Sequence, residues 1–250
     1  MEEDCSLLSG ETIDALGYQG LRIIQNPAKF KFTMDAFLLA GFIDPQPRHH
    51  LIDLGTGSGV LPLLIAGQSE IGFVYGLEIQ PELAAMAERN VILNQLSEKV
   101  KIVTGDIRTL PDVFKPNSFD YVISNPPFFK INAGLASENQ ALALAKFEIA
   151  CNLQDVVKAA SRLVRANGKV AFIYPSERLG ELILALDTHH LAPKRIRFVH
   201  PKPTVKSNLV VVEARPGVKN GPEVLPPLFI YHEAGEYTQE MNQIFHGKKL

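Results

Sequence analysis

Several features that would place this 250-residue chain in a specialised class are missing from its sequence. It has only two cysteines, Cys5 and Cys151, far apart and outside any C-x-x-C or C-x-H spacing, so neither a disulfide framework nor a zinc site is expected. No run approaches the roughly eighteen apolar residues needed to cross a bilayer, and the acidic start M-E-E-D-C has no apolar signal core. These absences predict a protein of the reducing cytoplasm, without a membrane segment or a metal.

The overall charge and composition exclude little. The formal net charge is -2, so any nucleic-acid surface has to come from local segregation of charge. A hydrophobic content of 46% with 21% charged residues is typical of a soluble globular protein. Because no repeat, low-complexity tract or long Gly/Ser linker divides the chain, we expect one domain over residues 1–250. Its expected parts are an N-terminal cap over 11–46, a core over 50–215 and a C-terminal extension over 216–250.

From residue 50 onward, short apolar runs alternate with helical patterns. Such alternation is typical of a doubly wound α/β fold around a mostly parallel sheet. Two later runs joined by a short Pro/Lys loop are too close for a helical crossover and predict an antiparallel hairpin at the end of the sheet. The expected parallel strands are 49–55, 71–79, 100–106, 119–125 and 168–175; the hairpin strands are 194–201 and 207–216; the main helices are 60–68, 81–95, 152–168 (ending at Gly168) and 176–188.

A glycine-rich turn follows the first of these strands in the run L-I-D-L-G-T-G-S-G-V. Asp53 ends the strand, and Gly55, Gly57 and Gly59 occupy the turn that leads into the next helix. Glycine permits positive φ there and lets a ligand touch bare backbone. A turn of this kind predicts a ligand site, although many sheets use one only to pack a helix against a strand.

Two further acids follow the next strands at the same edge of the sheet. Glu78 ends the second strand about twenty residues beyond the glycines, where a carboxylate can accept hydrogen bonds from both hydroxyls of a ribose. Asp106 follows the third strand. Val60 breaks the G-x-G-x-x-G fingerprint of dinucleotide sites, and no Gly-Lys-Ser/Thr triplet is present. The Asp53 carboxylate, at the place where a phosphate would otherwise bind, favours a ligand with positive charge, such as S-adenosylmethionine.

The run D-L-G-T-G-S-G resembles the glycine loop of class I S-adenosylmethionine-dependent methyltransferases. That resemblance implies that Glu78 binds the ribose of the methyl donor and that Asp106 lies near its adenine ring. It also implies a Rossmann-like sheet of seven strands with an antiparallel last strand.

The run S-N-P-P-F-F ends the fourth strand, since proline cannot donate to a sheet ladder. If the side-chain carbonyl of Asn125 and the backbone carbonyl of Pro126 each accept one hydrogen of a planar amine, its lone pair is freed for methyl transfer without a general base. Pro127 stiffens this turn, and Phe128 offers a face for an extruded base. The run resembles the N/D-P-P-F/Y/W motif of amino-nitrogen methyltransferases, which implies that Asn125 also borders the donor.

The stretches 20–43 and 226–247 resemble the bacterial family of transfer-RNA (adenine-N6) methyltransferases that modify valine tRNA beside its anticodon. The likeness covers the whole chain, but A-K-F-E at 145–148 replaces the basic-His-Glu sequence of many relatives. It implies methylation of an adenine N6 in tRNA by a cytoplasmic enzyme, expected to be a monomer. The alternatives are adenine-N6 or guanine-N2 methylation of ribosomal RNA, methylation of protein glutamine, and an inactive donor-binding protein that docks on RNA.

Charge distribution supports an RNA partner. No carboxylate occurs between Asp14 and Asp35 or between Asp187 and Glu213, and both spans contain basic residues. Acid-free basic strips of this kind predict contacts with a phosphate backbone and binding that depends steeply on salt. The expected RNA-binding residues are Lys29, Lys31, Arg195, Arg197, Lys202 and Lys206.

Overall fold

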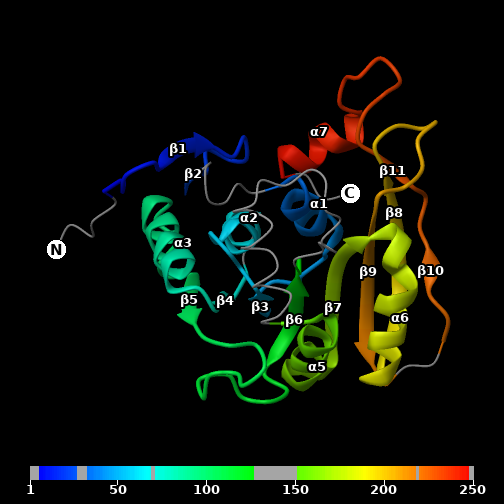
Figure 1. The fold of residues 1–250 in the computed structure, drawn as a ribbon, viewed down its shortest axis with the longest axis horizontal. Coiled ribbons are helices and arrows are strands. Elements are labelled where there is room, and N and C mark those ends of the chain that lie inside the picture. The colour runs from blue at the N-terminus through cyan, green and yellow to red at the C-terminus, as the bar shows by residue number, and fades with distance from the viewer. Residues whose placement is uncertain (1–5, 27–32, 69–70, 127–150, 218–219, 248–250) are drawn as a thin grey trace.

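The computed structural model describes residues 6–26, 33–68, 71–126, 151–217 and 220–247 (Figure 1). In these ranges a nine-stranded sheet has the order β10-β8-β9-β7-β6-β3-β4-β5, with β11 beside β8. Its strands are β3 (His50–Leu54), β4 (Phe73–Glu78), β5 (Val100–Thr104), β6 (Phe119–Ser124), β7 (Val164–Pro175), β8 (Leu191–His200), β9 (Leu209–Pro216), β10 (Glu223–Val224) and β11 (Leu228–Phe229).

The neighbours β7, β6, β3, β4 and β5 pair in parallel. β9 enters between β7 and β8 and is antiparallel to both, so the predicted hairpin of β8 and β9 is confirmed. The short strands β10 and β11, which the sequence did not indicate, extend the expected seven strands by pairing with the outer edge of β8. The doubly wound α/β fold is therefore confirmed.

Helices cover both faces of the sheet (Figure 1). Buried side chains of α1, α2, α3 and α7 form one apolar cluster with the sheet, and those of α5 and α6 form a second cluster on the other face. Burial on both faces explains why the strands are nearly continuous apolar runs. The helices are α1 (Asp35–Phe42), α2 (Val60–Gln68), α3 (Pro81–Leu93), α5 (Leu153–Leu163), η1 (Ser176–Arg178), α6 (Leu179–Thr188) and α7 (Gln239–Phe245).

The predicted end of the helix at Gly168 is wrong. α5 begins with a capping box in which Asp155 N–H donates to Asn152 Oδ1 (3.0 Å) and Asn152 N–H donates to Asp155 Oδ2 (3.1 Å). It ends at Leu163, and Gly168 lies inside β7. A Cβ on Gly168 would come within 2.9 Å of the Asp120 carbonyl oxygen. The glycine therefore allows β7 to pass close to β6 and is not a helix cap.

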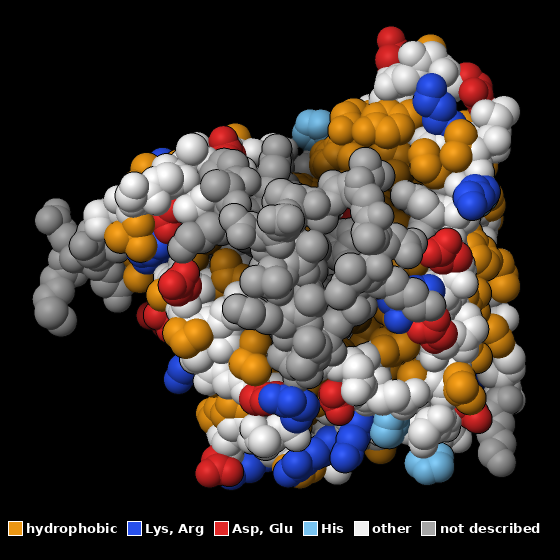
Figure 2. Space-filling model, in the orientation of Figure 1, with side chains coloured by type: hydrophobic (Ala, Val, Ile, Leu, Met, Phe, Trp, Pro, Cys, Tyr) orange, Lys and Arg blue, Asp and Glu red, His pale blue; other side chains and the backbone are white. Residues whose placement is uncertain are grey.

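Segments from both ends of the chain pack on the α1–α3 face. The strands β1 (Thr12–Ala15) and β2 (Arg22–Gln25) form an antiparallel hairpin beside α3. Aromatic rings link α7 to α1, because Phe245 packs edge-on against Phe37 (5.2 Å between centroids) and against Tyr237 (5.0 Å). Figure 2 shows hydrophobic side chains at the surface in this region, where Tyr237 is 39% exposed. No helix in the described ranges is long and apolar enough to span a bilayer.

Candidate active site

The carboxyl ends of four neighbouring parallel strands gather the residues that the sequence singled out. The glycine turn follows β3, Glu78 ends β4, Asp106 follows β5 and Asn125 follows β6. Since β3 lies between β4 and β6, the turn lies between Glu78 on one side and Asn125 on the other. Ligands of open α/β sheets bind at this edge.

The glycine turn has the backbone that its sequence predicts. Gly55, Gly57 and Gly59 have φ values of +80°, +57° and +83°, where an L side chain is strained. A Cβ on Gly59 would also come 3.1 Å from the Cβ of Ala87 on α3. Replacing Gly59 would therefore both strain the turn and push it away from α3.

Hydrogen bonds hold this turn against the end of β4. The N–H groups of Gly55 and Thr56 donate to the carbonyl oxygen of Leu77 (2.9 and 3.0 Å). The N–H of Gly57 donates to Glu78 Oε2 (2.9 Å), and the N–H of Gln80 donates to Glu78 Oε1 (3.0 Å). The carboxylate that is expected to hold a ribose thus also fixes the turn beside it.

Two of the three acids are deeply buried. Asp53 and Glu78 are each 1% exposed. Burial raises the pKa of Asp53 to about 7 against the lowering effect of the nearby Thr56 side chain, and the Glu78 carboxylate adds to the rise. Burial also raises the pKa of Glu78, while the N–H groups of Gln80 and Gly57 act in the opposite direction. Asp53 Oδ1 accepts no hydrogen bond within the part of the chain that the structure describes. It is therefore ready to receive a donor group from a ligand.

Asp106 lies in a different environment. Its carboxylate accepts hydrogen bonds from the Arg108 side chain at 2.6 to 3.1 Å and from the Arg108 N–H at 2.8 Å. The side-chain hydrogen bonds from Arg108 lower the pKa of Asp106. The Asp106 side chain is 22% exposed and follows β5, the last strand on this side of the sheet.

The end of β6 is tied directly to the end of β3. Ser124 Oγ donates to the Leu54 carbonyl oxygen (2.7 Å, buried), which brings the next residue, Asn125, beside the glycine turn. Asn125 Oδ1 is buried and accepts no hydrogen bond from the residues described. Asn125 and Pro126 directly follow β6. Pro127, Phe128 and the A-K-F-E segment at 145–148 lie outside the described residues.

A cavity of about 220 Å³ adjoins Pro126 at this edge of the sheet. Tyr174, at the end of β7, lines it, and the Arg178 guanidinium lies 5.1 Å from the Tyr174 ring centroid. Cys151 also lines the cavity, but burial raises the pKa of its thiol to about 11, so it offers no thiolate at neutral pH. The described residues contain no group of three or more His, Cys, Asp or Glu side chains that could hold a metal ion.

A family model described as "Methyltransferase domain" matches residues 46–202, a span that contains the glycine turn, the three acids and Asn125. The chain belongs to this methyltransferase family. The protein named "tRNA1(Val) (adenine(37)-N6)-methyltransferase" from Porphyromonas gingivalis strain W83 is 30% identical to this methyltransferase, with 91% of each chain covered. The protein of the same name from Glaesserella parasuis is 27% identical and covers 85% of this chain and 87% of its own.

Solved structures confirm the fold. A predicted O-methyltransferase from Agrobacterium tumefaciens superposes with a TM-score of 0.71 at 21% identity, over 86% of this chain and 97% of its own. The enzyme is thus an S-adenosylmethionine-dependent methyltransferase with a Rossmann-like sheet. Its residues fit that methyl donor, because Asp53 Oδ1 and Asn125 Oδ1 are buried acceptors without partners. A cation and an N–H donor at this edge would satisfy them.

The expected RNA-binding residues of the methyltransferase divide into three groups. Lys29 and Lys31 lie outside the described residues. Arg195 and Arg197 are not unopposed, since Arg195 lies 3.5 Å from Glu213 and Arg197 lies 2.5 Å from Glu240. Glu213 and Glu240 therefore neutralise the positive charges of these two arginines, which have no nearby acid in the sequence.

Lys202 and Lys206 belong to the loop between β8 and β9. β8 runs parallel to β7, so this loop lies at the same edge as Asn125. Lys202 Nζ donates to the Glu233 carbonyl oxygen (3.0 Å). Lys206 is exposed and lines a groove of about 630 Å³ together with Pro175, at the end of β7. The edge that holds the candidate active site therefore continues into a groove in which Lys206 is the cation and Glu177 the anion.

Three residues that position the site were not singled out from the sequence. Ser124 joins β6 to β3, and Gly76 of β4 leaves room for Thr56, whose Cγ2 would lie 2.8 Å from an added Cβ. Asn90 of α3 donates to the Ser58 carbonyl oxygen of the glycine turn (3.0 Å). A glycine within a strand is a usable sign of close approach, but a serine or asparagine in an apolar run has no distinctive pattern.

Proposed function

We propose that this methyltransferase transfers the methyl group of S-adenosylmethionine to the exocyclic N6 of an adenine in tRNA. The names of the relatives further support adenine 37 of a valine tRNA as the target. The observation that carries the proposal is the buried, unpartnered Oδ1 of Asn125 beside the glycine turn. An acceptor in that position matches an amine that must be held by its hydrogens. A tRNA substrate is consistent with a cytoplasmic enzyme.

The proposed donor site uses the three acids and the glycine turn, and Asn125 borders it on the side of the substrate amine. When bound, S-adenosylmethionine supplies a methyl group activated by its sulfonium. In this chain the ionised Asp53 would bind the donor's ammonium group, since the two charges neutralise each other in a buried place. Glu78 would accept the ribose hydroxyls, and Asp106 would lie near the adenine ring. Gly55, Gly57 and Gly59 would let the donor approach the backbone closely.

The proposed chemistry needs no general base from the protein. Asn125 Oδ1 and the Pro126 carbonyl oxygen would each accept one hydrogen of the adenine amine. The nitrogen lone pair would then leave conjugation with the ring and attack the donor's methyl carbon as the bond from that carbon to sulfur breaks. S-adenosylhomocysteine would be the leaving group, and the cationic nitrogen of the product would release one proton to water. Pro127 would stiffen the turn and Phe128 would stack on the flipped base, as the sequence predicts. We assign the cavity beside Pro126 and Tyr174 to this base.

The substrate is tested by incubating the protein with labelled S-adenosylmethionine and separate pools of tRNA, ribosomal RNA and cellular protein. We expect label only in tRNA, as N6-methyladenosine, and its formation to be about 10²- to 10³-fold slower when Asn125→Ala replaces the wild type. Label in ribosomal RNA or in protein glutamine, and not in tRNA, would show that the proposed substrate is wrong. Donor binding without label in any pool would favour an inactive protein that docks on RNA.

We also propose that the groove lined by Lys206 carries the tRNA backbone past the active site. Lys206→Ala is expected to weaken tRNA binding three- to tenfold, or about 0.7 to 1.4 kcal/mol, and to reduce the salt slope of the binding constant by about 1. Filter binding at several salt concentrations measures both quantities. Lys115→Ala is the matched control, because Lys115 is exposed at the opposite edge, just before β6. Equal effects of the two variants on tRNA binding would show that Lys206 does not contact the RNA backbone.

A further inference from the structure

The hairpin of β1 and β2 is held to α3 by two asparagines one helical turn apart. Asn94 Oδ1 accepts from Arg22 N–H (2.8 Å), and Asn94 Nδ2 donates to Arg22 O (2.7 Å). Asn90 makes the same pair of bonds with Ile24, at 2.6 and 3.0 Å. Four residues of helix rise about 6 Å and two residues of strand about 6.7 Å, so the side-chain amides match the strand. The helix thus substitutes for a neighbouring strand along β2.

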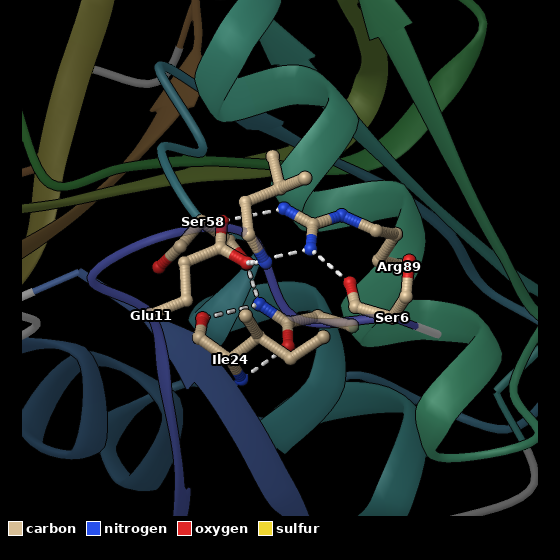
Figure 3. A network of polar contacts seen from close by, with 7 residues as sticks. Ser6, Glu11, Ile24, Ser58 and Arg89 are labelled. Carbon is tan, nitrogen blue, oxygen red and sulfur yellow. Dashed lines mark hydrogen bonds and ion pairs between the residues drawn. The ribbon is translucent and has the colours of Figure 1, made fainter. Parts of the chain in front are cut away.

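Asn90 differs from Asn94 in one contact. Its Nδ2 also donates to the Ser58 carbonyl oxygen of the glycine turn (3.0 Å), while Asn94 Nδ2 donates to the Asn90 carbonyl of its own helix. Asn90 is fully buried. Its Oδ1 binds β2, and its Nδ2 binds both β2 and the glycine turn. Figure 3 labels Ser58 and Ile24 in this network. One amide group therefore connects the N-terminal hairpin to the glycine turn.

The Ser58 carbonyl lies just outside α2, where the helix cannot supply it with a donor. Gly59, with φ +83°, separates it from Val60, the first residue of the helix. The first bond of the helical ladder runs from the Leu63 N–H to the Gly59 carbonyl oxygen (3.2 Å). A buried carbonyl without a donor is costly. Asn90 provides a donor from the neighbouring helix α3.

A second contact fastens the same N-terminal segment to α3. The Arg89 guanidinium donates to both carboxylate oxygens of Glu11 (2.6 and 2.7 Å) and to the Ser6 carbonyl oxygen (2.9 Å), as Figure 3 shows. The Arg89 and Glu11 side chains are 15% and 4% exposed, so this ion pair is shielded from water. The segment that reaches Asn90 is thus held at two places on one helix.

We propose that Asn90 is a positioning residue for the methyl donor, which couples docking of the N-terminal hairpin to the geometry of the glycine turn. The inference rests on the donor site given under Proposed function. If the hairpin holds Asn90 and Asn90 holds Ser58, a docked hairpin favours the donor-binding form of the turn. By linkage, a bound donor then stabilises the docked hairpin by the same factor.

The test compares Asn90→Ala with Asn94→Ala by calorimetric titration with S-adenosylhomocysteine. Each variant loses two bonds to β2, so both are expected to lower Tm. Only Asn90→Ala also loses the bond to Ser58, and we expect its Kd to rise at least tenfold, against less than twofold for Asn94→Ala. Equal Kd values for the two variants would overturn the inference and leave the donor site standing. Failure of the wild type to bind would overturn both.

A measurement on the wild type tests the coupling without depending on a variant that has to fold. Hydrogen exchange of the Ile24 N–H, which donates to Asn90, is followed with and without S-adenosylhomocysteine. We expect the bound ligand to slow this exchange at least fivefold, and to leave Val157 of α5, on the other face of the sheet, within twofold. An unchanged rate at Ile24 with ligand bound would overturn the coupling.

Discussion

Asn125→Ala is expected to lower kcat for tRNA methylation by about 10²- to 10³-fold while leaving the donor Kd within a few-fold of wild type. Removing one preorganised hydrogen-bonding group from a transition-state site has an effect of about this size. The reason here is that Asn125 Oδ1, a buried acceptor, would no longer hold the amine. Single-turnover rates with saturating donor, together with calorimetry, separate the chemical step from donor binding.

Asn125→Asp is the conservative partner of this experiment. An aspartate keeps an acceptor oxygen at the same place, and the motif that the chain resembles allows it. We therefore expect it to recover part of the rate that alanine loses. An alanine variant that loses donor affinity instead of rate would assign Asn125 to donor binding. A variant with normal rate and normal affinity would remove the residue from the site.

Asp53→Asn is expected to weaken donor binding at least tenfold at pH 8 and to flatten its pH dependence. In the wild type, burial holds the pKa of Asp53 at about 7, so the carboxylate that would bind the donor's ammonium forms as the pH rises through 7. Donor affinity of the wild type should rise toward pH 7 and then level off. Calorimetry between pH 5 and 8 measures both profiles.

Asp120→Asn is the matched control for the loss of one carboxylate. Asp120 lies on the neighbouring strand β6 but near its amino end, where it binds Arg165 (2.6 Å) and the His50 N–H (2.9 Å). This variant should keep wild-type donor affinity at every pH. A pH profile that persists in Asp53→Asn would show that another group controls donor binding.

Asp53→Asn should also make the ligand-free protein more stable than the wild type at pH 8. Between pH 4 and 7 the unfolded chain has ionised Asp53 and the folded chain has not, so the free energy of unfolding falls by about 1.4 kcal/mol per pH unit. Asparagine removes this decline at position 53. We expect a gain on the order of 2 kcal/mol at pH 8, less than the full decline because the amide also lacks a partner.

Denaturant unfolding at pH 5 and pH 8, without donor, measures this difference. A variant less stable than the wild type at pH 8 would mean that the ionised Asp53 supports the fold rather than the ligand. Opposite signs for stability and donor affinity are the signature of a buried charge retained for binding.

Local sequence was sufficient to predict most of the sheet and the candidate donor site. The strands that cross the core are buried on both faces, so β3 and β6 are apolar runs that end where a glycine or a proline follows. Asp53, Glu78 and Asn125 were identified because each lies at the end of such a run. Their assignment to the donor or to the amine stays a prediction, supported by burial and by unpartnered atoms.

Long-range contacts were not accessible from the sequence. The end of α5 was misplaced because R-A-N-G resembles a helix end, whereas the need for glycine at 168 arises from the backbone of β6. The charge of Arg197 looked unopposed because its partner, Glu240, is 43 residues away in sequence. Asn90 was missed because Ile24 and Ser58, its two partners, are 66 and 32 residues away.

The bond from Asn90 to the Ser58 carbonyl has a consequence for how this sequence can change over evolutionary time. One side-chain amide serves a strand 66 residues away and a turn 32 residues away, so a substitution at 90 disturbs both at once. The amide of Asn94 serves only β2 and its own helix. Descendants of this gene are therefore expected to retain asparagine more strictly at 90 than at 94.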